Sequence, residues 1–195
     1  MNDHSPWQSL KEERTKLNAL EIIRFLLIFL VIFVGVQLSL QSFVVDGVSM
    51  EPSFHNNQYL VVDKLTYRIG SLNRGDVIVF ENPQNPDNPP LIKRIIGLPG
   101  EQVEIKAGHF YIDGNRLDET PVLSEVTGYQ DYSVTLPPDH YFVIGDNRSN
   151  STGSHIFGPL SKDAIVGRVW LCYWPPSEWG LNPDYSASAE SPDGS

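Results

Sequence analysis

The feature that most constrains this chain is a long apolar run near its N-terminus. Residues 22–45 are nearly all Ile, Leu, Phe and Val, and Phe25–Val36 contains no polar side chain. With its flank up to Leu40, the run reaches the ~20 residues that a helix needs to cross a bilayer. We therefore predict a transmembrane signal anchor over residues 21–43.

Two other interpretations compete with an uncleaved anchor. A cleaved secretory signal ends in a small-x-small site, but Gln37–Gln41 offers only Ser39 among bulky residues. A buried helix of a globular domain normally carries a polar stripe at helical spacing, and the run has none. The sequence therefore favours an anchor that stays attached to the rest of the chain.

Basic residues lie on only one side of the apolar run. Those that precede or open it are Lys11, Arg14, Lys16 and Arg24. After the run, the next basic residue is Lys64. Because positive flanks stay in the cytoplasm, we expect a cytoplasmic N-terminal segment over residues 1–20 and the rest of the chain on the non-cytoplasmic side.

After the anchor, the chain reads as a single, mainly β domain over residues 44–184. Helical periodicity almost disappears, and short runs rich in β-branched and aromatic residues alternate with turn residues. The predicted strands are 58–62, 76–80, 91–96, 102–105, 109–112, 141–144 and 165–173. Asp113–Asn115 provides the glycine-containing turn of a hairpin. Residues 185–195, rich in Ser, Ala and acids, are predicted to be a disordered tail.

Charge and cysteine content exclude several classes of protein. The chain has 24 acidic and 14 basic residues, and the acidic excess lies after the anchor, which argues against a nucleic-acid partner and favours solubility as its role. The single cysteine, Cys172, excludes an internal disulfide framework, and its apolar neighbours predict a buried, unreactive thiol. No His/Cys spacing suits zinc, so we expect neither a metal nor a cofactor.

Ser49 and Lys93 are candidates for nucleophilic catalysis. Ser49 lies shortly after the apolar run in a stretch with the composition of a loop, where reactive side chains are often displayed. Strand alternation places Lys93 on one face with Leu91 and Ile95. Desolvation on such a face lowers the pKa of a lysine, and a neutral amine can accept a serine proton. Taken alone, a surface serine and a lysine that extends its ammonium into water are the simpler interpretation.

Three sequence blocks favour the catalytic interpretation over the simpler one: Val45–Pro52, Lys93–Glu101 and Gly145–Ser151. Together they resemble the bacterial type I signal peptidases, in the right order and over roughly residues 20–180. The resemblance implies a membrane-bound serine endopeptidase that removes signal peptides from exported preproteins, cutting after small-x-small sequences. In that family a serine is the nucleophile and a lysine the base, positions matched here by Ser49 and Lys93.

The resemblance also implies roles for the third block. Ser151 matches the family serine that hydrogen-bonds and orients the lysine, and Asp146 and Arg148 match residues that brace the site. The backbone N–H of Ser49 is expected to stabilise the oxyanion. The short stretch between Glu101 and Gly145 resembles the minimal members of the family, which lack a large inserted second domain.

Three positions depart from the common pattern of the family. Gly153 stands where an aspartate is usual and His155 where an arginine is usual, so the ion pair that often joins those two positions cannot form. Gly47 replaces the serine that, in part of the family, offers its hydroxyl to the oxyanion.

Signal peptides and membrane lipid are the expected partners. We expect an extended substrate strand to add to a sheet edge beside the dyad, with Val44, Val48 and Met50 as candidates to line the pockets. One alternative is a catalytically silent β-domain tethered to the membrane for binding. A self-cleaving regulator uses the same dyad, but the anchor argues against it. A partnership of Ser154 with His155 is a further, weaker possibility, because no Gly-x-Ser-x-Gly elbow is present.

Overall fold

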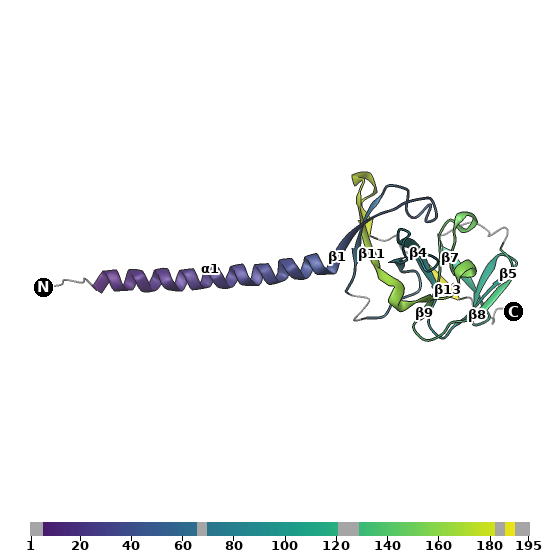
Figure 1. The fold of residues 1–195 in the computed structure, drawn as a ribbon, viewed down its shortest axis with the longest axis horizontal. Coiled ribbons are helices and arrows are strands. Elements are labelled where there is room, and N and C mark those ends of the chain that lie inside the picture. Colours follow the sequence, from purple (N-terminus) through teal and green to yellow (C-terminus); the bar gives the residue numbers. More distant parts are fainter. Residues whose placement is uncertain (1–5, 66–69, 121–128, 182–185, 190–195) are drawn as a thin grey trace. The chain divides into compact units, whose positions relative to one another are not determined.

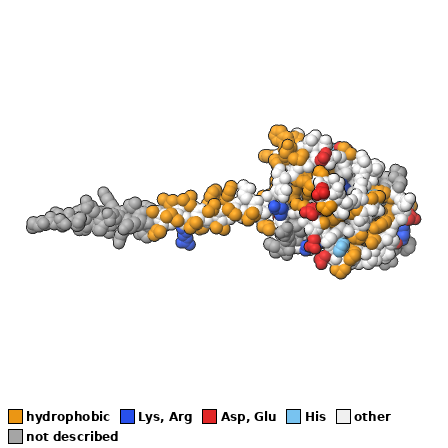
Figure 2. Space-filling view, in the orientation of Figure 1, with side chains coloured by type: hydrophobic (Ala, Val, Ile, Leu, Met, Phe, Trp, Pro, Cys, Tyr) orange, Lys and Arg blue, Asp and Glu red, His pale blue; other side chains and the backbone are white. Residues whose placement is uncertain are grey.

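The computed structural model describes residues 6–65, 70–120, 129–181 and 186–189, and divides into two units, residues 1–39 and 40–195. The first unit is helix α1, Pro6–Ser39 (Figure 1). Within α1, the 21 residues Ala19–Ser39 are long and apolar enough to cross a membrane, reaching about 30 Å at ~1.5 Å per residue. The apolar side chains of this stretch are exposed along its length (Figure 2).

The helix ends at Ser39, before the predicted end of the anchor at residue 43. The next residues, Leu40–Val44, form strand β1, which pairs with β2 in the second unit. The structure therefore assigns the last part of the predicted anchor to the sheet, because backbone groups that pair with a neighbouring strand cannot continue the helical ladder.

The second unit is built almost entirely of antiparallel strands, as the sequence predicted. The larger sheet contains β1 (Leu40–Val44), β2 (Tyr59–Asp63), β3 (Val77–Phe80), β4 (Leu91–Gly97), β9 (His140–Ile144), β10 (Leu160–Ser161), β11 (Ile165–Trp174) and β12 (Gly180–Leu181). The smaller sheet contains β5 (Gln102–Lys106), β6 (His109–Ile112), β7 (Asn115–Thr120), β8 (Tyr132–Thr135) and β13 (Ser186–Ala189). Among the described residues, four short helices lie between consecutive strands of the larger sheet: η1 (Arg148–Asn150), α3 (Ser154–Phe157), η2 (Lys162–Ala164) and η3 (Pro176–Glu178).

The strand order explains how distant segments of the sequence meet. The larger sheet has the order β1-β2-β11-β3-β4-β9-β10, with β12 beside β11, and the smaller sheet has the order β13-β7-β6-β5-β8. The predicted hairpin joins β6 to β7 through Asp113 (φ 51°) and Gly114 (φ 82°). Two consecutive positive φ values are those of a type I′ turn, which matches the twist of the flanking strands.

Three apolar clusters fill the described part of this unit. The first contains Met50, Ile92 and Cys172, and so anchors the residue after Ser49 and the residue before Lys93 in one core. The prediction for Cys172 is confirmed, since its side chain is buried and burial raises the pKa of its thiol.

The predicted disordered tail contains a strand. Ser186–Ala189 forms β13 and pairs with β7 across four residues at the edge of the smaller sheet. Small Ser and Ala side chains do not favour strands strongly, so this pairing depends on the free backbone edge of β7, a tertiary feature. Residues 185 and 190–195 of the predicted tail lie outside the described residues.

Candidate active site

The fold brings Ser49 and Lys93 into direct contact. Ser49 lies in the turn that follows β1, whereas Lys93 lies in the middle of β4. The Lys93 Nζ and the Ser49 Oγ are 2.7 Å apart, within hydrogen-bonding distance. Forty-four residues separate the two in sequence, so the contact depends on the arrangement of the strands.

Lys93 occupies a dry environment, as its position in an apolar strand predicted. Its side chain is only 3% exposed, and burial lowers the pKa of its ammonium from 10.5 to about 8, against a smaller opposing effect of the Asp146 carboxylate. Burial acts in this direction because the charged form loses hydration. About a tenth of the amine is therefore neutral at pH 7, far more than for an unperturbed lysine, and this neutral form can act as a base.

The Lys93 amine has a second hydrogen-bond partner. Its Nζ donates to the backbone carbonyl of Ile92 at 2.9 Å. In a neutral amine this bond fixes one N–H, which leaves the nitrogen lone pair free to face the hydroxyl of Ser49 and accept its proton.

The turn that carries Ser49 is held from both sides. Met50 is fully buried in the first apolar cluster, which fixes the chain directly after the serine. Asn147 donates its backbone N–H to the Ser49 carbonyl at 3.1 Å and its side-chain amide to the Val48 carbonyl at 3.1 Å. No hydrogen bond among the described residues uses the Ser49 N–H, which leaves that donor available to a ligand.

Gly145 allows the third block to approach the serine closely. A Cβ at this position would overlap the Ser49 carbonyl oxygen and the Ser151 Oγ, so both groups lie on the face of Gly145 that a side chain would occupy. The Gly145 N–H donates to the Ser151 Oγ at 3.0 Å. Ser151 thus holds the backbone on which Ser49 rests, and the two hydrogen bonds of the Lys93 amine go to Ser49 and Ile92 rather than to Ser151.

Asp146 forms a buried ion pair with Arg94, the residue after Lys93. Two hydrogen bonds join the guanidinium to the carboxylate, Arg94 Nε to Oδ1 at 2.8 Å and Nη2 to Oδ2 at 2.6 Å. The side chains are 1% and 0% exposed, and Arg94 also donates to the Gly75 carbonyl at 2.8 Å. Separating the two side chains would leave a buried charge without a partner, which is energetically costly. The ion pair therefore holds β4 against the third block.

Sequence reasoning selected Asp146 but missed its partner Arg94 and the close approach at Gly145. Strand alternation puts Arg94 on the face opposite Lys93, and a basic residue inside an otherwise apolar strand was the available signal. Arg148 also lies in the site's support, because its Nε donates to the Gly145 carbonyl at 3.1 Å and its guanidinium stacks over the Phe110 ring.

The three departures from the family pattern have visible structural consequences. At Gly153 a Cβ would meet the Val143 carbonyl oxygen at 2.7 Å, so an aspartate does not fit without a backbone shift. The His155 ring packs against Tyr129 in a tilted arrangement, with ring centroids 4.3 Å apart and an interplanar angle of 49°. Gly47 has a φ of 96°, a left-handed conformation that an L side chain adopts only with strain, although space for one is open.

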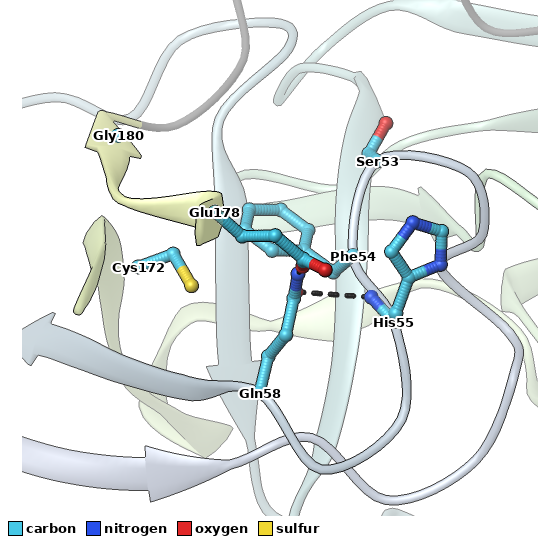
Figure 3. A pocket seen from close by; sticks show the side chains of 7 residues that line it. All are labelled: Ser53, Phe54, His55, Gln58, Cys172, Glu178 and Gly180. Carbon is cyan, nitrogen blue, oxygen red and sulfur yellow. Dashed lines mark hydrogen bonds between the residues drawn. The ribbon is translucent and has the colours of Figure 1, made fainter. Parts of the chain in front are cut away.

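A hollow of about 300 Å³ lies beside the buried side chain of Gln58 (Figure 3). The His55 N–H donates to Gln58 Oε1 at 2.9 Å, and Gln58 Nε2 donates to Glu178. Cys172 also lines this hollow. None of these groups contacts the Ser49–Lys93 pair, and no described histidine shares a hydrogen bond with either residue. Within the described residues, no group of three or more His, Cys, Asp or Glu could hold a metal ion.

The chain is similar to known proteins over most of its length. The family model described as "Signal peptidase, peptidase S26" matches residues 19–174. A Synechocystis protein named "Probable signal peptidase I-1" is 36% identical over 90% of this chain and 88% of its own length. Another, "Probable signal peptidase I-2", is 38% identical over 70% of this chain and 64% of its own length.

Similar proteins also occur outside that genus. A Staphylococcus aureus protein named "Signal peptidase IB" is 30% identical over 83% of this chain and 92% of its own length. A crystal structure of a signal peptidase I from Enterococcus faecalis is 34% identical, with a TM-score of 0.45, and covers 51% of this chain and 97% of that chain.

Proposed function

The chain belongs to the signal peptidase family, peptidase S26, and on that basis we propose that Ser49 is its catalytic nucleophile and Lys93 its general base. The chain is a type I signal peptidase that removes signal peptides from exported preproteins. The observation that supports the dyad is the 2.7 Å contact between the Ser49 hydroxyl and a buried amine whose pKa burial lowers to about 8.

The proposed reaction has two steps. In the first, neutral Lys93 takes the Ser49 proton as Oγ attacks the scissile carbonyl carbon, and the resulting ammonium then gives that proton to the leaving amine as the C–N bond breaks. In the second, Lys93 removes a proton from water, which attacks the acyl-enzyme ester, and the proton returns to the Ser49 oxygen. The base thus starts and ends each cycle neutral.

The developing oxyanion needs a hydrogen-bond donor. The Ser49 N–H suits this role because no described group competes for it. Gly47 contributes no hydroxyl, and its own N–H donates to Asn56 Oδ1 at 2.9 Å. Each oxyanion donor of this kind is worth ~3 kcal/mol of transition-state stabilisation.

The substrate strand has a free edge available beside Lys93. Strand β9 pairs with β4 only from Arg94 to Gly97, so on that side no described strand pairs with Leu91–Lys93. An extended signal peptide that adds to this edge brings its scissile carbonyl to the dyad. Of the pocket candidates, Val44 and Val48 are exposed and available to substrate, whereas Met50 belongs to the core.

The supporting residues act on the backbone around the dyad. Asp146 fixes β4 through Arg94, Arg148 and Ser151 hold Gly145, and Gly145 supports Ser49. In this chain, Ser151 positions the serine through the backbone rather than by bonding the lysine directly.

The N-terminal apolar helix is consistent with a single-pass membrane anchor of a signal peptidase I. We assign its N-terminal end to the cytoplasm. The second unit, residues 40–195 (the β unit), then lies on the non-cytoplasmic side, because the basic residues precede the apolar stretch. Membrane lipid is then a partner of the anchor, and we expect cleavage after small-x-small sequences, as the family resemblance implies.

A membrane-tethered binding module is the alternative, and it has no use for a buried, partly neutral lysine beside a serine. The purified full chain in detergent is expected to cut a preprotein, and Ser49→Ala should abolish this cleavage. Ser71→Ala, at an exposed serine outside the site, is the matched control and should leave it unchanged. Substantial cleavage by the Ser49→Ala protein would refute the assignment.

A further inference from the structure

A hollow of about 650 Å³ lies beside Ser151 and has no part in the chemistry described above. Tyr129, Tyr132 and Ile156 give it an aromatic and apolar part, whereas most of its lining is polar and includes the charged Asp131 and Arg148 as well as Ser151 and His155. Ile156 is 59% exposed, so an apolar side chain at this rim faces solvent in the free protein. A concave surface where aromatic side chains lie beside convergent hydrogen-bonding groups suits a peptide, which presents both apolar side chains and backbone polar groups.

His155 offers an unused hydrogen-bonding group in this hollow. Its Nδ1 is buried and has no partner among the described residues. Burial lowers the pKa of the imidazole, so the ring is neutral at neutral pH and one of its nitrogens can accept a hydrogen bond. Tyr129 packs against the ring at a tilt and is itself fixed, because its hydroxyl donates to the Arg148 carbonyl at 2.7 Å. A buried polar atom without a partner is costly, which points to a ligand that satisfies it.

Ser151 links the hollow to the neighbourhood of the catalytic site. The Ser151 hydroxyl lies on the same face of Gly145 as the Ser49 carbonyl oxygen, as shown by the overlap that a Cβ at Gly145 would have with both. Ser151 therefore belongs both to the support of the nucleophile and to the rim of the hollow.

The strand register shows where a bound substrate must leave the sheet. The pairing of β4 with β9 ends where Arg94 lies opposite Ile144, so the chain leaves the sheet at Gly145, next to the free edge that begins at Lys93. A substrate strand on the free edge of Leu91–Lys93 therefore meets Gly145 at the dyad. After Gly145 the protein's own backbone runs beside Ser49, and the Asn147 N–H donates to the Ser49 carbonyl. The substrate cannot continue straight past this point and must turn away, across the segment that carries Ser151.

We propose that this hollow binds the first residues of the mature chain, those directly after the scissile bond, and that His155 Nδ1 accepts a backbone N–H from them. The inference rests on the proposed Ser49–Lys93 dyad, since the dyad fixes where the scissile bond lies. The apolar walls then select among side chains on the mature side of the bond. His155 is thus a positioning and specificity residue, and it takes no part in proton transfer.

The test compares two substrates of the full chain in detergent. Both share one signal-peptide segment; the first continues into several mature residues, and the second ends in a small amide directly after the scissile bond. His155→Leu should lower kcat/KM roughly 2- to 10-fold for the extended substrate, as expected for one lost hydrogen bond, and leave the truncated substrate unchanged. His155→Asn, which keeps an acceptor, should recover part of the loss. His140→Leu, at a histidine that does not line the hollow, is the control.

A second readout does not depend on the imidazole. Ile156→Ala, at an exposed wall residue, should change the preference between extended substrates that carry Ala or Trp as the second mature residue. Equal losses on extended and truncated substrates, or an unchanged preference in both the His155 and Ile156 variants, would overturn the proposal. Cleavage that persists in Ser49→Ala would instead overturn the dyad, and the comparison of the two substrates would still report on the hollow.

Discussion

Replacing Lys93 with Met should remove activity and, at the same time, stabilise the fold below about pH 8. Met is nearly the same size as Lys and carries no charge, so it fills the same buried volume without requiring a charged group to lose its hydration. The pKa of Lys93 falls from 10.5 to about 8 on folding, which corresponds to roughly 3 kcal/mol of destabilisation whenever both states are protonated.

The sign of the pH dependence follows from the two pKa values. Between about pH 8 and 10.5 the unfolded lysine still holds a proton that the folded lysine has lost, so the unfolded state binds more protons. The stability of the wild-type protein therefore rises with pH through this window. The Met variant lacks this contribution, so its advantage of roughly 3 kcal/mol should be present below pH 8 and fade as pH approaches 10.5.

The measurement is urea unfolding of the full chain in detergent, followed by tryptophan fluorescence, for both proteins from about pH 6 upward. Lost hydrogen bonds from Nζ to Ser49 and Ile92 offset the difference by about 1 kcal/mol each at every pH, so the pH-dependent part is the quantity to compare. Lys106→Met, at a lysine whose side chain is 56% exposed, is the control for replacing a lysine outside the core. A difference between Lys93→Met and wild type that stays constant across the window would refute the reasoning.

Four further outcomes follow from the site. The kcat/KM of the wild type should rise with pH through about 8, the pKa of the base; an acidic limb that disappears only when His155 is replaced would assign the base differently. Ser151→Ala should lower kcat roughly 10- to 1000-fold with KM little changed, because the Gly145 N–H loses its acceptor. Ser149→Ala serves as the control, and a near-normal kcat in Ser151→Ala would make Ser151 a turn residue only. Gly145→Ala should abolish cleavage in a folded protein, since its Cβ overlaps the Ser49 carbonyl, and retained activity would contradict that geometry. Protease added to the non-cytoplasmic face of vesicles should digest the β unit, and complete protection would reverse the assigned orientation.

The double change of Gly153 to Asp and His155 to Arg is not a route to a stronger site. The family pattern suggests that it would restore a brace, but a side chain at position 153 meets the Val143 carbonyl oxygen at 2.7 Å. In this chain, position 155 instead carries a neutral imidazole that packs against Tyr129 and lines the hollow beside Ser151. Gly47 raises a similar point, because its φ of 96° means that a serine there gains a hydroxyl at the cost of backbone strain, of order 1–3 kcal/mol.

The sequence by itself determined the features that depend on local pattern. The apolar stretch predicted the helix of the anchor, period-two alternation predicted most strands of the β unit, and Asp113–Gly114 predicted its hairpin turn. Strand alternation also predicted that Lys93 lies on a dry face, and the structure confirms that it is buried with a lowered pKa. These properties follow from neighbours within a few residues, which is the range over which periodicity carries information.

Only the tertiary structure decided which distant groups meet. The pairing of Arg94 with Asp146, the approach of Gly145 to Ser49, and the hollow around His155 each join segments that no local pattern connects. Strand β13 shows the same limit. Its small side chains do not predict a strand, and it forms one because its backbone pairs with the edge of β7. The physical reason is that burial, ion pairing and backbone pairing depend on how close two groups lie in space. The strand order sets these distances, and the residues next to each group in the sequence do not reveal that order.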